Sequence, residues 1–460
     1  MNLKADLLVI GGGMAGLVAG TVASESGLTT LLLRKGQSAT ANSSGAIDVI
    51  GYVPDVLEPF SSPEEGLLAI VALYPLHPYA IVGYGDDVTS EETSAAIIGR
   101  VREAIMWLKE HLGGTIASVT GEFDTNMHLI TIIGTTKPTC LAQMTMCPGD
   151  LEDREDSVLL FAGITGCSEF NPSAAAKTYI EDRMALDGPP HKVGHCMFQV
   201  TPFGKSFNIS SIEIARHLDR EGSIEALAEQ LKVQVKRIGA THVALPPVLG
   251  IRNAIANKSK LEKLIGATVF ELLGFPPSVP GLRLQQALEG VFIKAGGKML
   301  VGHEAISHVR TKQRVAAVIA RGPLREIRVD AKAIILATGK YIGGGIAGDE
   351  KGLRETVFDI MTVTDDYHSS RDIVPSRSTN RLSINPTGQP IQACGVGIDS
   401  QFRPVREDGL EWAENLFAAG AVLAGYNYSV EKSGLGVALT SGYSAAKNAI
   451  DFLREVKQVE

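Results

Sequence analysis

The stretch LLVIGGGMAGLVAG at residues 7–20 constrains the fold more than any other part of the chain. It begins within a continuous apolar segment, Asp6–Ile10, of the kind found in strands that are buried on both faces of a sheet. Three glycines follow, and then a run of small residues, Met14–Ser26, that is typical of a closely packed helix. After Gly27 the pattern predicts a second buried strand at Thr29–Leu33. The order strand, glycine turn, helix, strand predicts the opening unit of a Rossmann-like sheet.

The glycines of this stretch have the spacing G-x-G-x-x-G. Gly11 permits a tight turn, Gly13 lets the backbone approach phosphate oxygens, and Gly16 lets the helix pack closely on the sheet. The first amide N–H groups of a helix have no partner within the helix, so together with the helix dipole they favour an anion. The motif therefore predicts a site for a cofactor phosphate.

Residues 51–295 differ in character from this opening unit. Helical stretches alternate there with proline-rich connections such as ALPPVLG and FPPSVPG, which indicates a separate mixed lobe. Strand patterns return in 296–345, where two alternating strands precede a buried one that ends in ILATG. Residues 346–405 are polar and rich in arginine, and 406–460 are predicted to form a strand, the loop KSGLG and a long helix of small residues.

This order of segments separates two classes of dinucleotide-binding enzyme. A one-domain nicotinamide dehydrogenase adds strand–helix units directly after the second strand, whereas FAD enzymes of the glutathione-reductase and fumarate-reductase type interrupt the sheet and resume it with a β-meander. The predicted fold class is therefore α/β: a Rossmann-like FAD/NAD(P)-binding fold with a β-meander and a second, mixed α+β lobe inserted. The flavin-binding domain would comprise 1–50, 296–345 and 406–460, and the second lobe 51–295 with an extension at 346–405.

Composition argues against several other classes of protein. The formal net charge of −8 at pH 7 is unfavourable for a nucleic-acid-binding protein, which needs a basic face. No apolar run approaches the ~20 residues that cross a bilayer, so we expect no transmembrane segment and membrane association only through a partner or a surface patch. The five cysteines include no C-x-x-C pair, which favours a reducing, intracellular compartment over secretion.

No metal site is expected. His191, His195 and Cys196 lack a second close pair of ligands, as a zinc site would need. His242 and His303 lie in apolar strand contexts, which are typical of structural histidines.

Several longer stretches of sequence accompany the glycines. With GGGMAGL, they are KGQSATANSSGAIDVIG, LPPVLG, GFPPSVPGLRLQQAL, AGGKMLVGHE, ILATGKYIGGGI and LFAAGAVLAGYNYSVEKSGLGVA. The run from GQSA to SSGAID and the segment GFPPSVPGLRL are much more specific than the glycine motif. On these words the sequence resembles the B subunits of the anaerobic glycerol-3-phosphate dehydrogenases. The resemblance covers most of the chain, although residues 60–150 carry little that matches.

The resemblance implies a flavoprotein, usually assigned FMN, that works with two partners: a homologous catalytic flavoprotein, the A subunit, and an iron–sulfur protein, the C subunit. Such a complex would take a small phosphorylated substrate, oxidise sn-glycerol 3-phosphate to dihydroxyacetone phosphate, and send electrons towards quinone during anaerobic respiration on glycerol. The chain would then be cytoplasmic and peripheral on the inner face of the cell membrane, held there by its partner subunits.

Two positions depart from the usual pattern of FAD enzymes. An acid at the end of the second strand normally accepts hydrogen bonds from the adenosine ribose, but Arg34 and Lys35 stand there and neither can accept one. Many FAD enzymes also have an acid after the late glycine, where this chain has Gly420-Ala421. Three interpretations stay open: FMN with the basic pair near its phosphate, FAD held mainly by backbone, or NADP with its 2′-phosphate on the basic pair.

The expected flavin contacts combine the glycine turn, the end of the second strand, the SSG segment and the loops after the later strands. They are Gly11, Gly12, Gly13, Met14, Ala15, Gly16, Arg34, Lys35, Ser43, Ser44, Gly45, Thr338, Gly339, Gly420, Ala421, Ser433, Gly434 and Gly436. The last three begin a helix whose amide dipoles could stabilise negative charge on a reduced flavin ring.

One arginine-rich segment, HSSRDIVPSRSTNRLS, holds the candidate catalytic residues His368, Arg371, Arg377 and Arg381. Guanidinium groups suit phosphate recognition, and a histidine can accept the proton of a secondary alcohol that loses hydride. The segment can equally be a solvated loop or a docking face for a partner protein. Lys340 and the pair Glu431-Lys432 are weaker candidates near the flavin face.

Three functions remain open from the sequence. The first is a flavin subunit of a heteromeric glycerol-3-phosphate dehydrogenase that relays electrons or supports the catalytic subunit. The second is a self-sufficient soluble flavin oxidoreductase of the fumarate-reductase type. The third is a non-catalytic scaffold that kept a flavoprotein fold, for which Arg34 and Ala421 are the motivation.

Overall fold

The computed structural model forms two compact units. The first comprises Met1–Ala39, Asp48–His111 and Leu288–Glu460, and the second comprises Thr40–Ile47 and Leu112–Ala287. The structure describes residues 2–54, 56, 58–82, 91–186, 188, 190–203, 206–350, 352–364, 378–383, 385–406 and 408–459. Residues 51–111 and 346–405, which the sequence pattern assigned to the second lobe, are grouped here with the first unit. The domain boundaries themselves stay a prediction.

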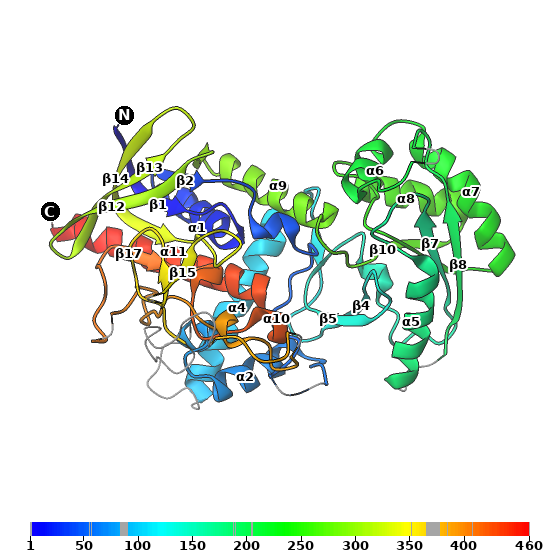
Figure 1. Ribbon diagram of the computed structural model, residues 1–460, viewed down its shortest axis with the longest axis horizontal. Coiled ribbons are helices and arrows are strands. Elements are labelled where there is room, and N and C mark those ends of the chain that lie inside the picture. The colour runs from blue at the N-terminus through cyan, green and yellow to red at the C-terminus, as the bar shows by residue number, and fades with distance from the viewer. Residues whose placement is uncertain are drawn as a thin grey trace. The chain divides into compact units, whose positions relative to one another are not determined.

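The first unit is built on a seven-stranded sheet (Figure 1). Its order is β11-β2-β1-β14-β13-β12, and β17 also pairs with β14. The strands are β1 (Asn2–Ile10), β2 (Thr30–Arg34), β11 (Lys298–Val301), β12 (Glu304–Thr311), β13 (Arg314–Arg321), β14 (Glu326–Leu336) and β17 (Leu416–Ala418). The parallel part, β11-β2-β1-β14-β17, has the 3-2-1-4-5 order of a dinucleotide-binding sheet. The antiparallel strands β12, β13 and β14 form the predicted meander.

The sequence of β14 explains how one strand serves both parts of the sheet. Its first half, EIRVDA, alternates in burial and pairs with β13 over Glu326–Asp330. Its last residues, AIIL, are continuously buried and lie between β1 and β17. Alternation suits a strand with one solvated face, and an apolar run suits a strand covered on both faces.

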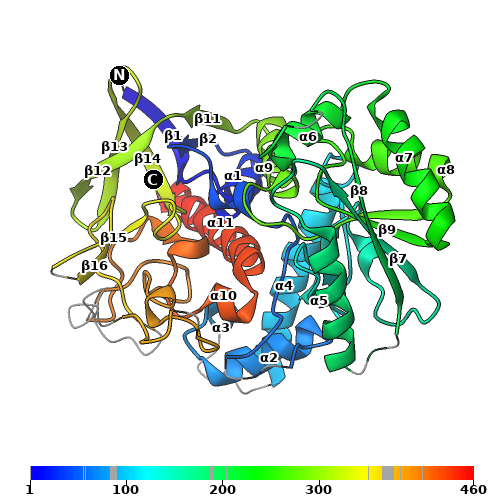
Figure 2. The ribbon, with the colours of Figure 1, turned by 45° about the vertical axis from the view of Figure 1, so that its right-hand side comes forward.

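Small residues allow the two main helices of the first unit to pack closely. They are α1 (Met14–Glu25) and α11 (Gly434–Val459), which lie side by side (Figure 2). A Cβ atom on Gly442 of α11 would stand 2.5 Å from the carbonyl oxygen of Ala15 in α1. On α1, a Cβ on Gly20 would stand 2.8 Å from the ring of Phe292, which belongs to α9 (Val279–Lys294).

Further elements complete the first unit. The start of α2 is capped, because Ser62 accepts a hydrogen bond from the amide of Glu65 and Pro63 occupies the first turn. The elements are α2 (Pro63–Leu73), α3 (Pro78–Val82), α4 (Glu91–Leu112), α10 (Tyr428–Glu431), β15 (Ile346–Asp349), β16 (Gly352–Glu355), η5 (Pro390–Gln392) and η6 (Gly420–Val422). The short helix η1 (Ala39–Asn42) begins at the last residue of the first segment and continues into the second unit.

The second unit has a sheet of its own, in which β10-β9-β7-β8 are all parallel. Because β8 and β9 flank β7 on opposite sides, the sheet is doubly wound. The elements are β7 (Val158–Ile164), β8 (Lys192–Phe198), β9 (His242–Leu245), β10 (Thr268–Glu271), α5 (Pro172–Ala185), α6 (Ser211–Leu218), α7 (Ser223–Ile238) and α8 (Ala254–Ile265). Short pieces precede them: β3 (Val119–Thr120), β4 (Met127–Ile130), β5 (Thr136–Thr139), β6 (Ala142–Gln143) and η2 (Cys147–Gly149). Alternate strand residues face α6–α8 on one side and α5 with β4 on the other.

Three of the specific sequence words meet in a buried polar network of the second unit. Arg283, from GLRLQQAL, is fully buried and donates to Glu271 at 2.6 and 2.9 Å. Its Nε–H donates to the carbonyl of Gly250, from LPPVLG, at 2.8 Å. The Gln143 amide donates to the carbonyl of Gly45, from the SSG segment, at 3.4 Å. These three stretches of sequence therefore have a structural role, because a buried charge must be paired and hydrogen-bonded.

Candidate functional site

The parallel strands of the first unit end together at one edge of the sheet. Ile10 of β1 lies beside Leu33 and Leu336, and Leu336 lies beside Ala418. The segments that follow these strands therefore leave the same edge. They contain the predicted cofactor residues Gly11, Gly12, Gly13, Met14, Ala15, Gly16, Arg34, Lys35, Thr338, Gly339, Gly420 and Ala421.

The glycine turn between β1 and α1 has no room for a side chain at Gly11 or at Gly16. Gly11 has φ +121°, and a Cβ atom there would stand 2.1 Å from the carbonyl oxygen of Ala337. A Cβ on Gly16 would stand 2.0 Å from the carbonyl oxygen of Gly11. Gly13 is the N-cap of α1 and has no side chain to occupy the amide end, and the first turn carries no acidic residue. The turn thus fits a phosphate group at a helix N-terminus.

The two basic residues at the end of β2, Arg34 in the strand and Lys35 just after it, are each paired with an acid. The side chain of Arg34 crosses Gly12, where a Cβ atom would stand 2.7 Å from Arg34 Cδ. Its guanidinium then pairs with Glu289 of α9. The ammonium of Lys35 pairs with Glu304 of β12 at 2.6 Å. Both positive charges therefore already have partners within the protein.

The loops after β14 and β17 bring small and polar groups to the same edge. Thr338 Oγ1 is buried and has no hydrogen-bond partner among the described residues. Gly339 and Gly420 turn the chain with φ +76° and +77°. The Gly420 amide donates to Ser441 Oγ at 2.8 Å, and Ala421 follows it without an acidic group. A buried hydroxyl without a partner fits a ligand atom that completes its hydrogen bonding.

The start of α11 is only partly open to a ligand. Ser433 donates its hydroxyl hydrogen to Glu431 at 2.7 Å. The amide of Gly436 donates to the carbonyl of Asp48 at 3.0 Å, and a Cβ on Gly436 would stand 2.6 Å from that oxygen. The Gly436 amide is therefore engaged within the protein, which leaves Gly434 and Leu435 as the first amides of the helix.

A second polar group, missed as a unit by sequence reasoning, lies beside this helix start. Glu431 accepts from His77 Nε2 at 3.2 Å and from the Asn427 amide at 2.5 Å, in addition to Ser433. The Tyr79 amide donates to His77 Nδ1 at 3.1 Å, so the ring proton of a neutral His77 sits on Nε2. Burial raises the pKa of Glu431, but the imidazole, hydroxyl and amide around it hold that pKa below its usual value.

Lys340 follows the Thr338-Gly339 turn and carries a buried ammonium. It is 5% exposed, lies 4.9 Å from the centroid of the Tyr426 ring, and donates to the carbonyl of Gln392. The described residues offer its three N–H groups no other acceptor, and Tyr426 Oη is buried without any partner among them. Burial lowers the pKa of Lys340 to about 8, although Cys394 and Glu431 oppose that change. This pair can donate to, and place positive charge beside, a ligand atom at the sheet edge.

The other predicted residues are placed as follows. Ser43, Ser44 and Gly45 belong to the second unit, where the Ser43 hydroxyl donates to the Thr40 carbonyl at 2.7 Å. The candidate catalytic residues His368, Arg371 and Arg377 lie outside the described residues, and Arg381 is exposed.

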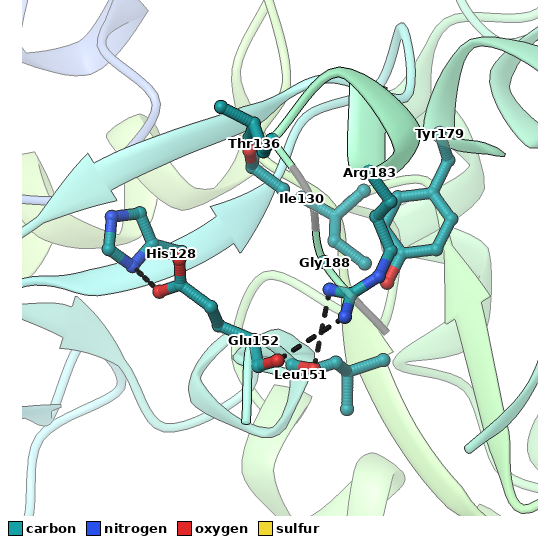
Figure 3. A pocket seen from close by; sticks show the side chains of 9 residues that line it. His128, Ile130, Thr136, Leu151, Glu152, Tyr179, Arg183 and Gly188 are labelled. Carbon is teal, nitrogen blue, oxygen red and sulfur yellow. Dashed lines mark hydrogen bonds and ion pairs between the residues drawn. The ribbon is translucent and has the colours of Figure 1, made fainter. Parts of the chain in front are cut away.

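A cavity of about 30 Å³ lies in the second unit. His128 pairs with the Glu152 carboxylate on one side of it, while Arg183 donates to the carbonyls of Glu152 and Leu151 on the other (Figure 3). Tyr179, whose pKa burial raises to about 12, forms part of the wall. The volume matches about one water molecule, so this cavity is too small for a flavin or a glycerol phosphate.

One amide cluster near the carboxyl edge of the second sheet is occupied by a side chain of the protein itself. Ligands of doubly wound sheets bind outside the strand ends at the point where the order reverses, which here lies between β7 and β9. The carboxylate of Asp219 occupies the amide cluster that follows β9, accepting from Ile251, Arg252 and Asn253 at 2.9–3.0 Å. It takes the position that an anionic ligand would need.

Among the described residues, no helix combines the length and the apolar character of a membrane span. Within the same ranges, no group of three or more His, Cys, Asp and Glu side chains is arranged to hold a metal ion. His191 Nδ1 forms a hydrogen bond with the Tyr179 hydroxyl at 2.8 Å.

The chain is similar to a known protein family and to several known proteins. The family model described as FAD binding domain matches residues 6–437. The B subunit of anaerobic glycerol-3-phosphate dehydrogenase from Vibrio cholerae serotype O1 is 29% identical, over 99% of this chain and 98% of that protein. The probable B subunit from Halobacterium salinarum is 30% identical, over 99% of this chain and 100% of that protein. A 3-ketosteroid delta1-dehydrogenase structure from Sterolibacterium denitrificans covers 97% of this chain and is itself covered completely, with 10% identity and a TM-score of 0.43.

The match to the family model spans most of the chain, and the relatives are matched over nearly their whole length. The chain therefore belongs to the FAD binding domain family and, within it, to the flavin-dependent oxidoreductases named as B subunits of anaerobic glycerol-3-phosphate dehydrogenase.

Proposed function

We propose that the chain binds FAD and serves as a flavin-carrying subunit of an anaerobic glycerol-3-phosphate dehydrogenase. The complex would oxidise sn-glycerol 3-phosphate to dihydroxyacetone phosphate, and this subunit would relay the electrons towards quinone or support the catalytic subunit. The observation that carries the proposal is the glycine turn between β1 and α1, where Gly11 and Gly16 leave no space for a Cβ atom. It lies at the sheet edge beside the buried hydroxyl of Thr338, which has no hydrogen-bond partner among the residues that the structure describes.

Each part of this edge has a proposed role. The amides of residues 12–16 would bind the pyrophosphate, and the Thr338 hydroxyl would complete its hydrogen bonding on the cofactor. Lys340 and Tyr426 would lie at the ring end, together with Gly434 at the start of α11. The SSG residues Ser43, Ser44 and Gly45 remain proposed contacts from the family resemblance alone.

When bound, the flavin accepts a hydride equivalent, that is, two electrons and one proton. The protein's own contribution would be electrostatic. A buried ammonium at Lys340 favours added negative charge close by, because the low dielectric of the interior strengthens the attraction. A flavin protein without an iron–sulfur cluster of its own would need a redox partner to export single electrons. This supports assembly with a catalytic flavoprotein, the A subunit, and an iron–sulfur protein, the C subunit.

The membrane location is part of the same proposal. We infer that partner subunits hold the chain at the inner face of the cell membrane. Separating membranes from cytosol tests this when the chain is expressed with and without the catalytic and iron–sulfur partners. The chain should sediment with the membranes only in their presence, and sedimentation of the chain alone would contradict it.

The central experiment identifies the cofactor and its reduction. Cofactor released from the purified chain should have the mass of FAD, and sn-glycerol 3-phosphate should bleach the flavin absorbance when the catalytic and iron–sulfur partners are present. Bleaching in the isolated chain would select the self-sufficient oxidoreductase instead. A colourless chain that takes up neither FAD nor FMN would overturn the proposal.

A non-catalytic scaffold is the second candidate. Two observations favour it: Ala421 lacks the usual acid, and the Gly436 amide already donates to Asp48. A Gly13→Asp complex that lost its flavin from this chain but kept full turnover would select the scaffold.

A further inference from the structure

The missing acid at the end of β2 raises a specific question about cofactor choice. FAD carries an adenosine ribose with two hydroxyl donors, and FMN lacks it. In dinucleotide sites an acid at this strand end accepts from that ribose. Arg34 stands there and has no acceptor, so the recognition must come from elsewhere or be absent.

The contacts of Arg34 identify another acid that could replace the missing one. Its side chain runs across Gly12, the middle glycine of the turn, with Arg34 Cδ 2.7 Å from the place of a Cβ atom. Its guanidinium ends on the Glu289 carboxylate. Arg34 Nε is buried and has no hydrogen-bond partner among the described residues. An acid is thus held beside the glycine turn, although it comes from a position 255 residues later in the chain.

The helix that carries Glu289 is fixed in place. Phe292 lies three residues further along α9, on the same side of the helix, and packs on Gly20 of α1. The side chains of Arg34 and Glu289 are 19% and 21% exposed, so the pair is largely shielded yet reachable. A carboxylate has about four lone-pair positions and can accept from several donors at once, so pairing with Arg34 is compatible with a bond from a ribose hydroxyl.

We propose that Glu289 takes the place of the missing strand-end acid and that Arg34 positions it, so that the site selects FAD over FMN through the adenosine ribose. The inference rests on the proposed function, because it concerns the same cofactor. It also explains why a basic residue is tolerated at the strand end: Arg34 orients the acid and leaves its Nε–H for an oxygen of the cofactor. Its paired guanidinium is correspondingly unsuited to the 2′-phosphate of NADP.

The test compares FAD and FMN on the full-length apo chain, by quenching of flavin fluorescence. Glu289→Gln keeps the shape of the side chain and removes its charge. We expect it to weaken FAD binding at least tenfold and to change FMN binding less than twofold. Glu289→Asp, which keeps the carboxylate, should lose less FAD affinity. Glu304→Gln is the matched control, since Glu304 pairs with the neighbouring Lys35, and it should change neither affinity.

Each outcome separates the inference from the function beneath it. A wild-type chain that binds FAD no more tightly than FMN overturns the inference, as does an equal loss of both flavins in Glu289→Gln. Unchanged FAD affinity in that variant also overturns it while leaving the flavin function intact. A wild-type chain that binds neither flavin overturns both. Melting curves of the apo variants check that the fold is kept.

Discussion

His77 donates a hydrogen bond to Glu431 at 3.2 Å, and the two residues are 0% and 2% exposed. They are 354 positions apart in the sequence. The backbone carbonyl of Glu431 also accepts from the amides of Gly51 and Tyr52. One residue therefore joins the turn before α3, the segment at Gly51 and the loop that leads into α11.

Replacing Glu431 by Gln should make the first unit less stable and less sensitive to acid. The pKa of Glu431 is lowered in the folded state, so its contribution is complete above the ordinary glutamate value of 4.5 and is lost as pH falls through the lower folded value. We expect a loss of about 1–3 kcal/mol at pH 7, as for a charged hydrogen-bond acceptor. Urea unfolding from pH 7 to pH 3 should show the two proteins converging. Glu64→Gln, which removes the acid of a surface pair with Arg102, serves as control, and parallel profiles for all three proteins would contradict the assignment.

Gly13 allows the phosphate site to be removed without breaking the fold. It is the N-cap of α1 with φ −85°, which other residues adopt readily. Aspartate and serine are both good N-caps, so Gly13→Asp and Gly13→Ser should fold normally. Aspartate adds a negative charge where a phosphate would bind, so flavin affinity should fall at least tenfold further in Gly13→Asp than in Gly13→Ser. Equal affinities, measured by equilibrium dialysis, would show that the anion does not lie at this helix end.

Lys340 should give the wild-type chain a distinctive alkaline profile. Its pKa is about 8 when folded and 10.5 when unfolded, so between these values the unfolded state binds more protons and stability rises with pH. The rise is at most about 3.5 kcal/mol, at about 1.4 kcal/mol per pKa unit. Lys340→Met should lack it. Lys177→Met, at a side chain 80% exposed, should keep the wild-type slope in urea titrations from pH 7.5 to 10.5. Profiles of the same slope in Lys340→Met and wild type would refute the buried ammonium.

The Arg283–Glu271 pair should be needed for the second unit. Arg283→Met leaves the Glu271 carboxylate buried without its main partner, which costs about 3–5 kcal/mol. Arg102→Met, in an exposed pair with Glu64, should cost less than about 1 kcal/mol. The double variant Arg283→Met, Glu271→Leu should recover stability relative to Arg283→Met alone, because no unpaired charge remains. Denaturant unfolding followed by circular dichroism measures all three, and an additive loss in the double variant would argue against the pairing.

Some features of the site followed directly from local sequence. The pattern predicted a strand at Asp6–Ile10 and a helix at Met14–Ser26, and the structure has β1 at Asn2–Ile10 and α1 at Met14–Glu25. The meander that ends in β14 and the late helix α11 also form in the predicted segments, although the first predicted strand of the meander is divided into β11 and β12. Periodic burial and the steric demands of glycine act over a few residues, so they can be recognised from the sequence alone. The resemblance to the B-subunit family is confirmed by relatives matched over almost the full chain.

Other features depended on contacts that no local pattern encodes. The sequence showed Arg34 and Lys35 as an unexplained basic pair, and the structure pairs them with Glu289 and Glu304. It suggested the amides of Ser433, Gly434 and Gly436 as a dipole for the flavin ring, and the structure engages Gly436 with Asp48. The sequence did not explain why the stretch GFPPSVPGLRL is distinctive. In the structure its Arg283 is bound to Gly250 and Glu271 within the second unit.

The sequence by itself determined the class of fold, the glycine turn and the family, because these depend on short-range geometry and on continuous stretches of sequence. Tertiary structure alone decided which charges are neutralised, where the buried acids lie and which helix amides stay open. Those properties arise when segments hundreds of residues apart are packed together, as Arg34 and Glu289 are, and burial then makes each pairing strong enough to matter.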